Sequence, residues 1–352
     1  MTSGTTKTTT MSLHVVGIQC CRMRVLWSNL RHGSRKLAFR SFENKEMCTA
    51  TTRGTRYLVS VQYDGQNSKE DAIAFEPNVV RALKRAIEKL VGRDNYSNFK
   101  ATSRTDAGVH GVHNTFHVDL VRRKRQTMDV SPSNFSTEEV LNGINFYLNN
   151  PAITITHCIA VKNDFDARKR VESRTYLYRI ICPRNRRKNL LEKNQPIKSK
   201  SMYQRHYAWI TRWHLDTEKM KQATQHLIGR KDFSVFACSG CQSPSPWKTV
   251  YSIEISERIN HDSNIHDTLH DNDVEITIAV TADSFLYKMV RNMVGILVKV
   301  GRGKMDPNEI KDVIDKKQIK EVRRAVLPPP NGLYLMSVNY NQEVLEKYRL
   351  EG

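Results

Sequence analysis

The sequence predicts an α+β fold in which helices cover a mostly antiparallel sheet. Between residues 57 and 339, segments whose apolar residues alternate with period two follow segments whose apolar residues recur every three or four positions. This succession occurs twice, which indicates two similar halves with helices packed on strands. No sequence repeat aligns between the halves, so a duplication would be architectural only.

The first half contains three predicted strands and two predicted helices. Ser136 is the clearest helix start, because Ser136 and Glu139 form a capping box ahead of an apolar run. Gly92 marks the end of the earlier helix. The predicted strands cover residues 57–63, 116–121 and 153–161, and the predicted helices cover 77–91 and 136–148.

The second half repeats this pattern. The helix predicted at 216–229 directs Met220, Ala223, Leu227 and Ile228 towards the core. The remaining predicted helices cover 284–300 and 307–317, and the strands cover 174–182, 250–255, 274–280 and 333–339. We therefore predict four parts: a leader of residues 1–53, halves of residues 54–165 and 166–345, and a tail of residues 346–352.

The charge balance predicts a polyanionic partner. The chain carries 56 Lys and Arg against 36 Asp and Glu, a net charge of +20, and its sequence pI is about 9.7. The apolar fraction of 39% and the charged fraction of 26% are those of a globular protein that buries a core. Nucleic acid is the simplest partner for such a charge.

The basic residues concentrate between residues 164 and 213, which contain 14 Lys or Arg and 4 Asp or Glu. Aromatic residues alternate with these charges, which suits RNA, since cations bind phosphate and rings stack on bases. The alternative is a solvated charged surface whose aromatics point into a core.

The apolar stretch 285–300 is interrupted by Lys288, Arg291 and Lys299, so it predicts a buried helix and no membrane span.

The first 53 residues resemble a mitochondrial presequence, because no acidic residue precedes Glu43 while basic residues are scattered among Ser, Thr and apolar ones. The alternative is a disordered basic tail, in which case the protein would be cytoplasmic or nuclear.

No metal site is predicted. The pair Cys238 and Cys241 has no second cysteine pair beside it, and the polar run 261–271 reads as an insertion between strands.

Residues 103–111, SRTDAGVHG, place a lone carboxylate beside an arginine and small residues. Asp106 is either a turn residue or a carboxylate that reacts. Four further segments bear on this choice, and they follow in the chain in this order: FDARKRVESRTYLYRI at 165–180, GRKDFSVF at 229–236, DSFLYKMVRNMVGILVKVGRGK at 283–304 and LPPPNGLYLMSV at 327–338.

Together these five segments resemble, in the same order, the motifs of the tRNA pseudouridine synthase A family, over residues 55–340. SRTYLYR and CSGCQSPSPWKTV resemble its eukaryotic synthase-like branch. The resemblance implies two ferredoxin-like (RRM-like) halves with a central RNA-binding cleft. It also implies an isomerase that needs no cofactor, acts on tRNA and forms a homodimer; other RNA could be a further substrate.

The family's nucleophilic aspartate falls on Asp106, which would attack C1′ of the ribose or C6 of the uracil. Arg291 matches the arginine that keeps this carboxylate ionised; an arginine that reaches the surface past apolar neighbours is the alternative. Tyr176 matches the active-site tyrosine that stacks on the base and can accept the C5 proton. Tyr178 lies on the same strand face as its structural partner.

Three positions are expected to contact RNA. Arg104 matches the arginine that replaces the flipped base, although a phosphate contact is the alternative. Leu333 matches a leucine that packs against uracil, and Gly108 allows the backbone to pass close to RNA. His110 binds phosphate or caps the turn.

The sequence departs from the family after the first strand. A Gly-Trp-Gln segment is expected there, but QNSKEDAIAFEPNVV follows Asp64 and Gly65. The departure concerns how tRNA is held and which uridine is chosen, for which the resemblance implies the anticodon arm. A protein of another class, which binds RNA or the ribosome without catalysis, is the alternative.

Overall fold

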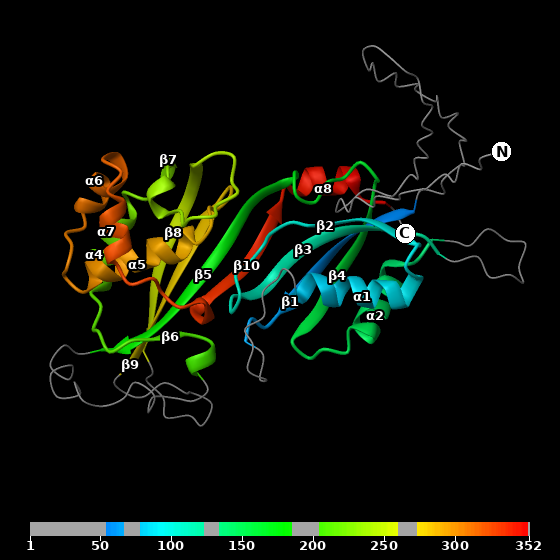
Figure 1. The fold of residues 1–352 in the computed structure, drawn as a ribbon, viewed down its shortest axis with the longest axis horizontal. Helices are drawn as coiled ribbons and strands as arrows, with labels where there is room; N and C mark the ends of the chain where they lie inside the picture. Colours follow the sequence, from blue (N-terminus) through cyan, green and yellow to red (C-terminus); the bar gives the residue numbers. More distant parts are fainter. Residues whose placement is uncertain (1–53, 67–77, 123–133, 185–203, 260–272, 351–352) are drawn as a thin grey trace, which may run out of the picture. The chain divides into compact units, whose positions relative to one another are not determined.

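A single ten-stranded sheet forms the centre of the fold, with strand order β4-β1-β3-β10-β5-β9-β8-β7, β2 beside β3 and β6 beside β5 (Figure 1). Among the strands of the described residues, only β10–β3 and β5–β6 pair in parallel, so the predicted mostly antiparallel sheet is confirmed. The strands are β1 Thr55–Tyr63, β2 Tyr96–Ala101, β3 His110–Leu120, β4 Ile153–Val161, β5 Val171–Pro183, β6 Trp209–Ile210, β7 Gly229–Asp232, β8 Trp247–Ile259, β9 Asp273–Ala282 and β10 Leu333–Tyr340.

This computed structural model describes residues 54–66, 78–122, 134–184, 204–259 and 273–350, all within one unit. The predicted leader, much of the basic stretch at 185–203 and the polar insertion at 261–271 lie outside the described residues. The predicted boundaries between the parts stay predictions. Within the described residues, no helix is long and apolar enough to cross a membrane.

Helices cover the sheet and bury two apolar clusters. One cluster joins α1 and α2 to β1, β3 and β4 through residues such as Leu83, Ile144 and Phe116. The other joins α4, α5 and α6 to β5, β8 and β9 through residues such as Met220 and Ile278. The helices are α1 Val80–Val91, α2 Thr137–Leu148, α4 Thr217–Thr224, α5 Met289–Gly301, α6 Glu309–Asp315, α7 Ile319–Arg324 and α8 Gln342–Tyr348.

Capping residues set several of these helix ends. Ser136 and Glu139 form the predicted capping box at the start of α2. Gly92 ends α1 with φ +95°, a conformation that favours glycine. Lys288 takes φ +59°, so α5 begins at Met289 and not at residue 284 as predicted. Residues 283–288 therefore form a loop ahead of this helix.

Some elements differ from the prediction. α4 ends at Thr224, and Ile228 is 38% exposed, so its predicted inward position is wrong; the chain has left the helix and enters β7 at Gly229 with φ +98°. β2 is absent from the predicted strands, because it lies in a polar run. Its side chains are half-buried or exposed. The segment 346–352, predicted as a tail, is helical up to Tyr348, whose ring packs against Phe165.

Most of the described aromatics of the basic stretch are core residues. Tyr176, Tyr178 and Trp209 are buried, whereas Tyr207 is 40% exposed. For Tyr178 and Trp209 the structure favours the alternative of packing in the core over stacking on bases.

His117 on β3 gives a testable pH dependence of stability. It is buried, its Nδ1 accepts the Ala167 N–H at 3.0 Å, and burial, aided by the charge of Arg56, lowers its pKa to about 4. The unfolded state binds a proton near pH 6.5 and the folded state does not, so stability falls as the pH drops from about 6.5 to 4. We expect a loss of at most about 2 kcal/mol between pH 7 and pH 5 from this residue.

His117→Asn keeps an acceptor for the Ala167 N–H but does not titrate. Urea unfolding at both pH values should show a smaller loss of stability for this variant. An identical loss in wild type and variant would contradict the assignment.

Candidate active site

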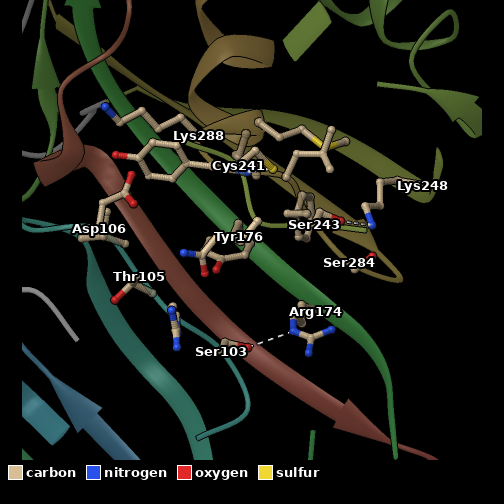
Figure 2. A pocket seen from close by; sticks show the side chains of 18 of the residues that line it. Ser103, Thr105, Asp106, Arg174, Tyr176, Cys241, Ser243, Lys248, Ser284 and Lys288 are labelled. Carbon is tan, nitrogen blue, oxygen red and sulfur yellow. Dashed lines mark hydrogen bonds between the residues drawn. The ribbon is translucent and has the colours of Figure 1, made fainter. Parts of the chain in front are cut away.

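A pocket of about 820 Å³ lies beside Asp106 (Figure 2). Its walls are the loop that follows β2, side chains of β5, the loop 240–244, the segment 283–291 and Leu333. Six basic and two acidic side chains line it: Arg104, Arg168, Arg174, Lys248, Lys288 and Arg291, against Asp106 and Asp283. The pocket therefore suits an anionic ligand.

Asp106 is both a turn residue and a pocket carboxylate. Its carbonyl accepts the Val109 N–H at 3.2 Å and closes a turn, while its side chain lines the pocket and is 26% exposed. Neighbouring residues hold the loop: the hydroxyls of Thr105 and Tyr63 lie 2.9 Å apart, and the Asn114 side-chain amide donates to the Ser103 carbonyl at 3.0 Å. The backbone is thus fixed and the carboxylate is available.

Arg291 extends from the first turn of α5 to this carboxylate. Its Nη1 lies 3.5 Å from Asp106 Oδ2, and its Nε donates to the Pro328 carbonyl at 2.8 Å. The side chain is only 9% exposed, so it does not reach the surface. The carboxylate contact is a single one and not bidentate, because the Pro328 carbonyl takes one edge of the guanidinium. Arg291 therefore places a buried cation beside the Asp106 carboxylate.

Tyr176 lies at the centre of β5, between Val280 on β9 and Leu335 on β10. Its ring packs edge-on against Phe285, with centroids 5.0 Å apart. Burial raises the pKa of Tyr176 to about 12, and the charge of Asp106 also raises it while that of Arg174 lowers it. The phenol is therefore neutral near pH 7.

Tyr178 is a structural residue of the core, as predicted. It is fully buried, its hydroxyl donates to the Pro329 carbonyl at 2.7 Å, and it is not among the residues that line the pocket. Leu333, its partner on β10, does line the pocket, and so does the exposed Arg104.

Gly108 and His110 lie beside the pocket but do not line it. Gly108 has φ +84°, and a Cβ there would come within 2.8 Å of the Pro330 side chain. His110 is buried, with Nε2 3.2 Å from the Asn331 carbonyl and Nδ1 3.0 Å from Asp64, and it stacks on Tyr334. These contacts hold the loop against the start of β10, and they explain both residues without RNA.

Comparisons with known proteins identify the family of this chain. A family model described as tRNA pseudouridine synthase matches residues 223–341. The tRNA pseudouridine synthase A of Methylobacterium nodulans is 33% identical over 291 residues, which cover 82% of this chain and 98% of the relative. The chain belongs to the tRNA pseudouridine synthase A family. The human tRNA pseudouridine synthase-like 1 is 30% identical over 302 residues, which cover 84% of this chain and 94% of the relative.

In this member of the synthase family, two pocket residues had no role predicted from the sequence: Arg174 and Lys248. Arg174 lies two residues before Tyr176 on β5, so the period-two pattern could have indicated it. It donates to Ser103 Oγ and to the Asp283 carbonyl, both at 2.9 Å, and so joins the loop that carries Asp106 to the end of β9. Lys248 follows Trp247 in the segment that resembles the eukaryotic branch.

No group of three or more His, Cys, Asp or Glu side chains in the described part of the chain is arranged to hold a metal ion. Cys238 and Cys241 are free thiols, and Cys241 lies in the pocket wall. The Asn292 side-chain amide and the Tyr287 N–H approach their sulfurs at 3.6 and 3.5 Å, respectively. These thiols thus help to order the loop before α5.

Proposed function

We propose that the protein converts specific uridines of tRNA into pseudouridine, with Asp106 as the nucleophile. The observation that carries the proposal is the Asp106 carboxylate, which lies 3.5 Å from buried Arg291 in a basic pocket that Tyr176 also lines. Membership of the family supports an isomerase that acts on tRNA.

The reaction breaks the N1–C1′ bond and forms a C5–C1′ bond, with no net change of atoms. If Asp106 attacks C1′, uracil leaves, rotates and returns through C5, which releases the carboxylate. If it adds to C6, the ring is held by an ester bond while C1′ moves to C5. In both routes C5 loses a proton and N1 gains one. The Arg291 guanidinium lies 3.5 Å from the carboxylate that attacks.

Tyr176 would stack on the base and take the C5 proton. Since its phenol is neutral near pH 7, the second role requires that substrate binding lower its pKa. Tyr176→Phe keeps the ring and removes the hydroxyl. We expect kcat to fall roughly 100-fold or more, the range for loss of a general base, with KM changed little. Steady-state kinetics on a tRNA transcript measure both, and an unchanged kcat would leave only the stacking role.

The target uridine must leave its stack to reach Asp106, which costs a few kcal/mol. We propose that the halves 54–165 and 166–345 are ferredoxin-like and form an RNA-binding cleft around this pocket. Arg104 would take the place of the flipped base, and Leu333 would pack against uracil. Gly108 and His110 would support the loop and not bind RNA. The anticodon arm is the proposed target region.

Pseudouridine mapping tests the proposal. Total and mitochondrial tRNA from cells with and without the protein should differ at specific uridines, and the purified protein should restore those sites in vitro. If no site changes in tRNA or in other RNA, while RNA binding persists, the alternative of a non-catalytic RNA-binding or ribosome-associated protein is favoured.

Two further parts of the proposal rest on sequence. We propose that residues 1–53 direct the protein to mitochondria, because basic residues occur there without acidic ones before Glu43. A fusion of residues 1–53 to a fluorescent protein should enter mitochondria, and diffuse fluorescence would contradict this.

We also propose a homodimer, which light scattering of the purified protein would show as twice the 40.6 kDa chain mass.

A further inference from the structure

We propose that Lys248 binds a phosphate group of the RNA substrate at the end of the pocket away from Asp106. The inference rests on the proposed function, since it takes RNA as the substrate. Figure 2 shows Asp106 and Lys288 on one side of the pocket, and Lys248 and Ser243 on the other.

Lys248 is a buried cation with no acidic partner among the described residues. It is only 8% exposed and lies in the pocket lining. Its Nζ donates one hydrogen bond, to Ser243 Oγ at 3.0 Å, and forms no ion pair with any described carboxylate. An ammonium has three donors, so two remain available. A buried charge without an anion is unfavourable, and an anionic ligand would relieve this cost.

The surrounding loop holds the ammonium without neutralising it. Ser243 Oγ donates its own proton to the Ser245 carbonyl at 3.0 Å, so its lone pairs face Lys248. Ser245 Oγ in turn accepts the Trp247 N–H at 3.2 Å. This network of neutral groups fixes the position of Nζ and leaves its full positive charge in the pocket.

Other charges at this end of the pocket add to the positive field. Arg174 lines it and donates to neutral oxygens only: Ser103 Oγ, the Asp283 carbonyl and the Thr102 carbonyl. Arg168 lines it as an exposed side chain. The one carboxylate nearby, Asp283, accepts the Thr249 N–H and the Ser284 hydroxyl and lies beyond ion-pair distance of Lys248.

A phosphate is the ligand that fits both the charge and the location. The pocket runs from Asp106 to Lys248, so a nucleotide held at Asp106 brings its own or a neighbouring phosphate into the same cavity. Phosphate oxygens accept several hydrogen bonds from ammonium groups and from an exposed arginine. We infer that Lys248 anchors the backbone next to the flipped uridine.

The test uses Lys248→Met in the full chain, because methionine keeps the apolar stem and removes the charge. In an Asp106→Asn background, the Kd for a tRNA transcript should rise about fivefold or more near physiological salt. The slope of log Kd against log salt should become shallower by about 0.7, the value for one phosphate contact on a single strand. In the catalytically intact chain, KM should rise in parallel while kcat changes less.

Lys316→Met is the matched control. Lys316 is exposed, pairs with Asp312 and does not line the pocket, yet its replacement removes the same charge. Lys248→Arg should restore most of the affinity if a cation is what matters. The thermal unfolding temperature of each variant shows whether the fold is intact.

The outcomes separate the inference from the proposed function. If wild type forms pseudouridine and folded Lys248→Met keeps the wild-type salt slope and KM, the phosphate site is overturned. If Lys248→Met loses affinity with an unchanged slope, its role is packing and the inference also fails. If wild type forms no pseudouridine, the proposed function fails, while the binding experiment still decides whether Lys248 contacts RNA.

Discussion

Asp106→Asn should lower the rate of pseudouridine formation by roughly 10⁴-fold or more, while tRNA binding stays within about threefold of wild type. The amide has the shape of the carboxylate, but it cannot act as the nucleophile in either route. Loss of a covalent nucleophile in enzymes has effects of this size or larger.

Binding should persist because the Asp106 side chain contributes little to the fold or to anion binding. The turn at Asp106 is closed by its main-chain carbonyl, and the side chain forms an ion pair, among the described residues, with Arg291 alone at 3.5 Å. Removal of one negative charge from a basic pocket does not weaken the binding of a polyanion.

Single-turnover assays on a tRNA transcript, together with filter binding, measure both quantities. Asp315→Asn, at an exposed position outside the pocket, is a control for the change of charge. Turnover by Asp106→Asn within tenfold of wild type would exclude Asp106 as the nucleophile.

The resemblance of five ordered segments to family motifs was enough to indicate the residues that meet in the pocket. Asp106, Tyr176 and Arg291 are far apart in the chain, and the structure brings them to one pocket from the loop before β3, from β5 and from α5. Periodicity also located elements whose burial is regular, such as β4, where the predicted bounds and the observed bounds agree. The bounds of such strands depend on an alternation of apolar residues that a short segment contains.

Other features depend on contacts that no local pattern contains. β2 is a polar run that becomes a strand because β3 supplies its partner. His110 was interpreted as a phosphate ligand or a cap of the turn, and its ring nitrogens lie next to Asp64 and Asn331, which are distant in sequence. No sequence pattern distinguishes Lys248, and only its place in the pocket wall reveals a buried charge.

Arg291→Lys should lower kcat roughly 100-fold, with tRNA affinity changed little. Two edges of one planar guanidinium serve two partners, because Nε donates to the Pro328 carbonyl while Nη1 faces Asp106. A lysine has one nitrogen and cannot hold both positions at once. Loss of one fixed charged donor in an active site has effects of this order.

Arg291→Leu separates stability from catalysis. It leaves the Pro328 carbonyl without its donor in a buried place, which costs about 1–3 kcal/mol of unfolding free energy. Chemical denaturation measures this cost, and the assay is run under conditions in which the variant is folded. Arg291→Lys at wild-type kcat would show that the arginine has a structural role only.

A double-mutant cycle decides whether Arg291 acts through Asp106. If the arginine serves only to hold the carboxylate in position, its replacement removes nothing further once the carboxylate is gone. Asp106→Asn with Arg291→Lys should then be as slow as Asp106→Asn alone, whereas independent roles would multiply the two losses. The 3.5 Å contact between the side chains, and the absence of any other described acidic partner for Arg291, favour the first result.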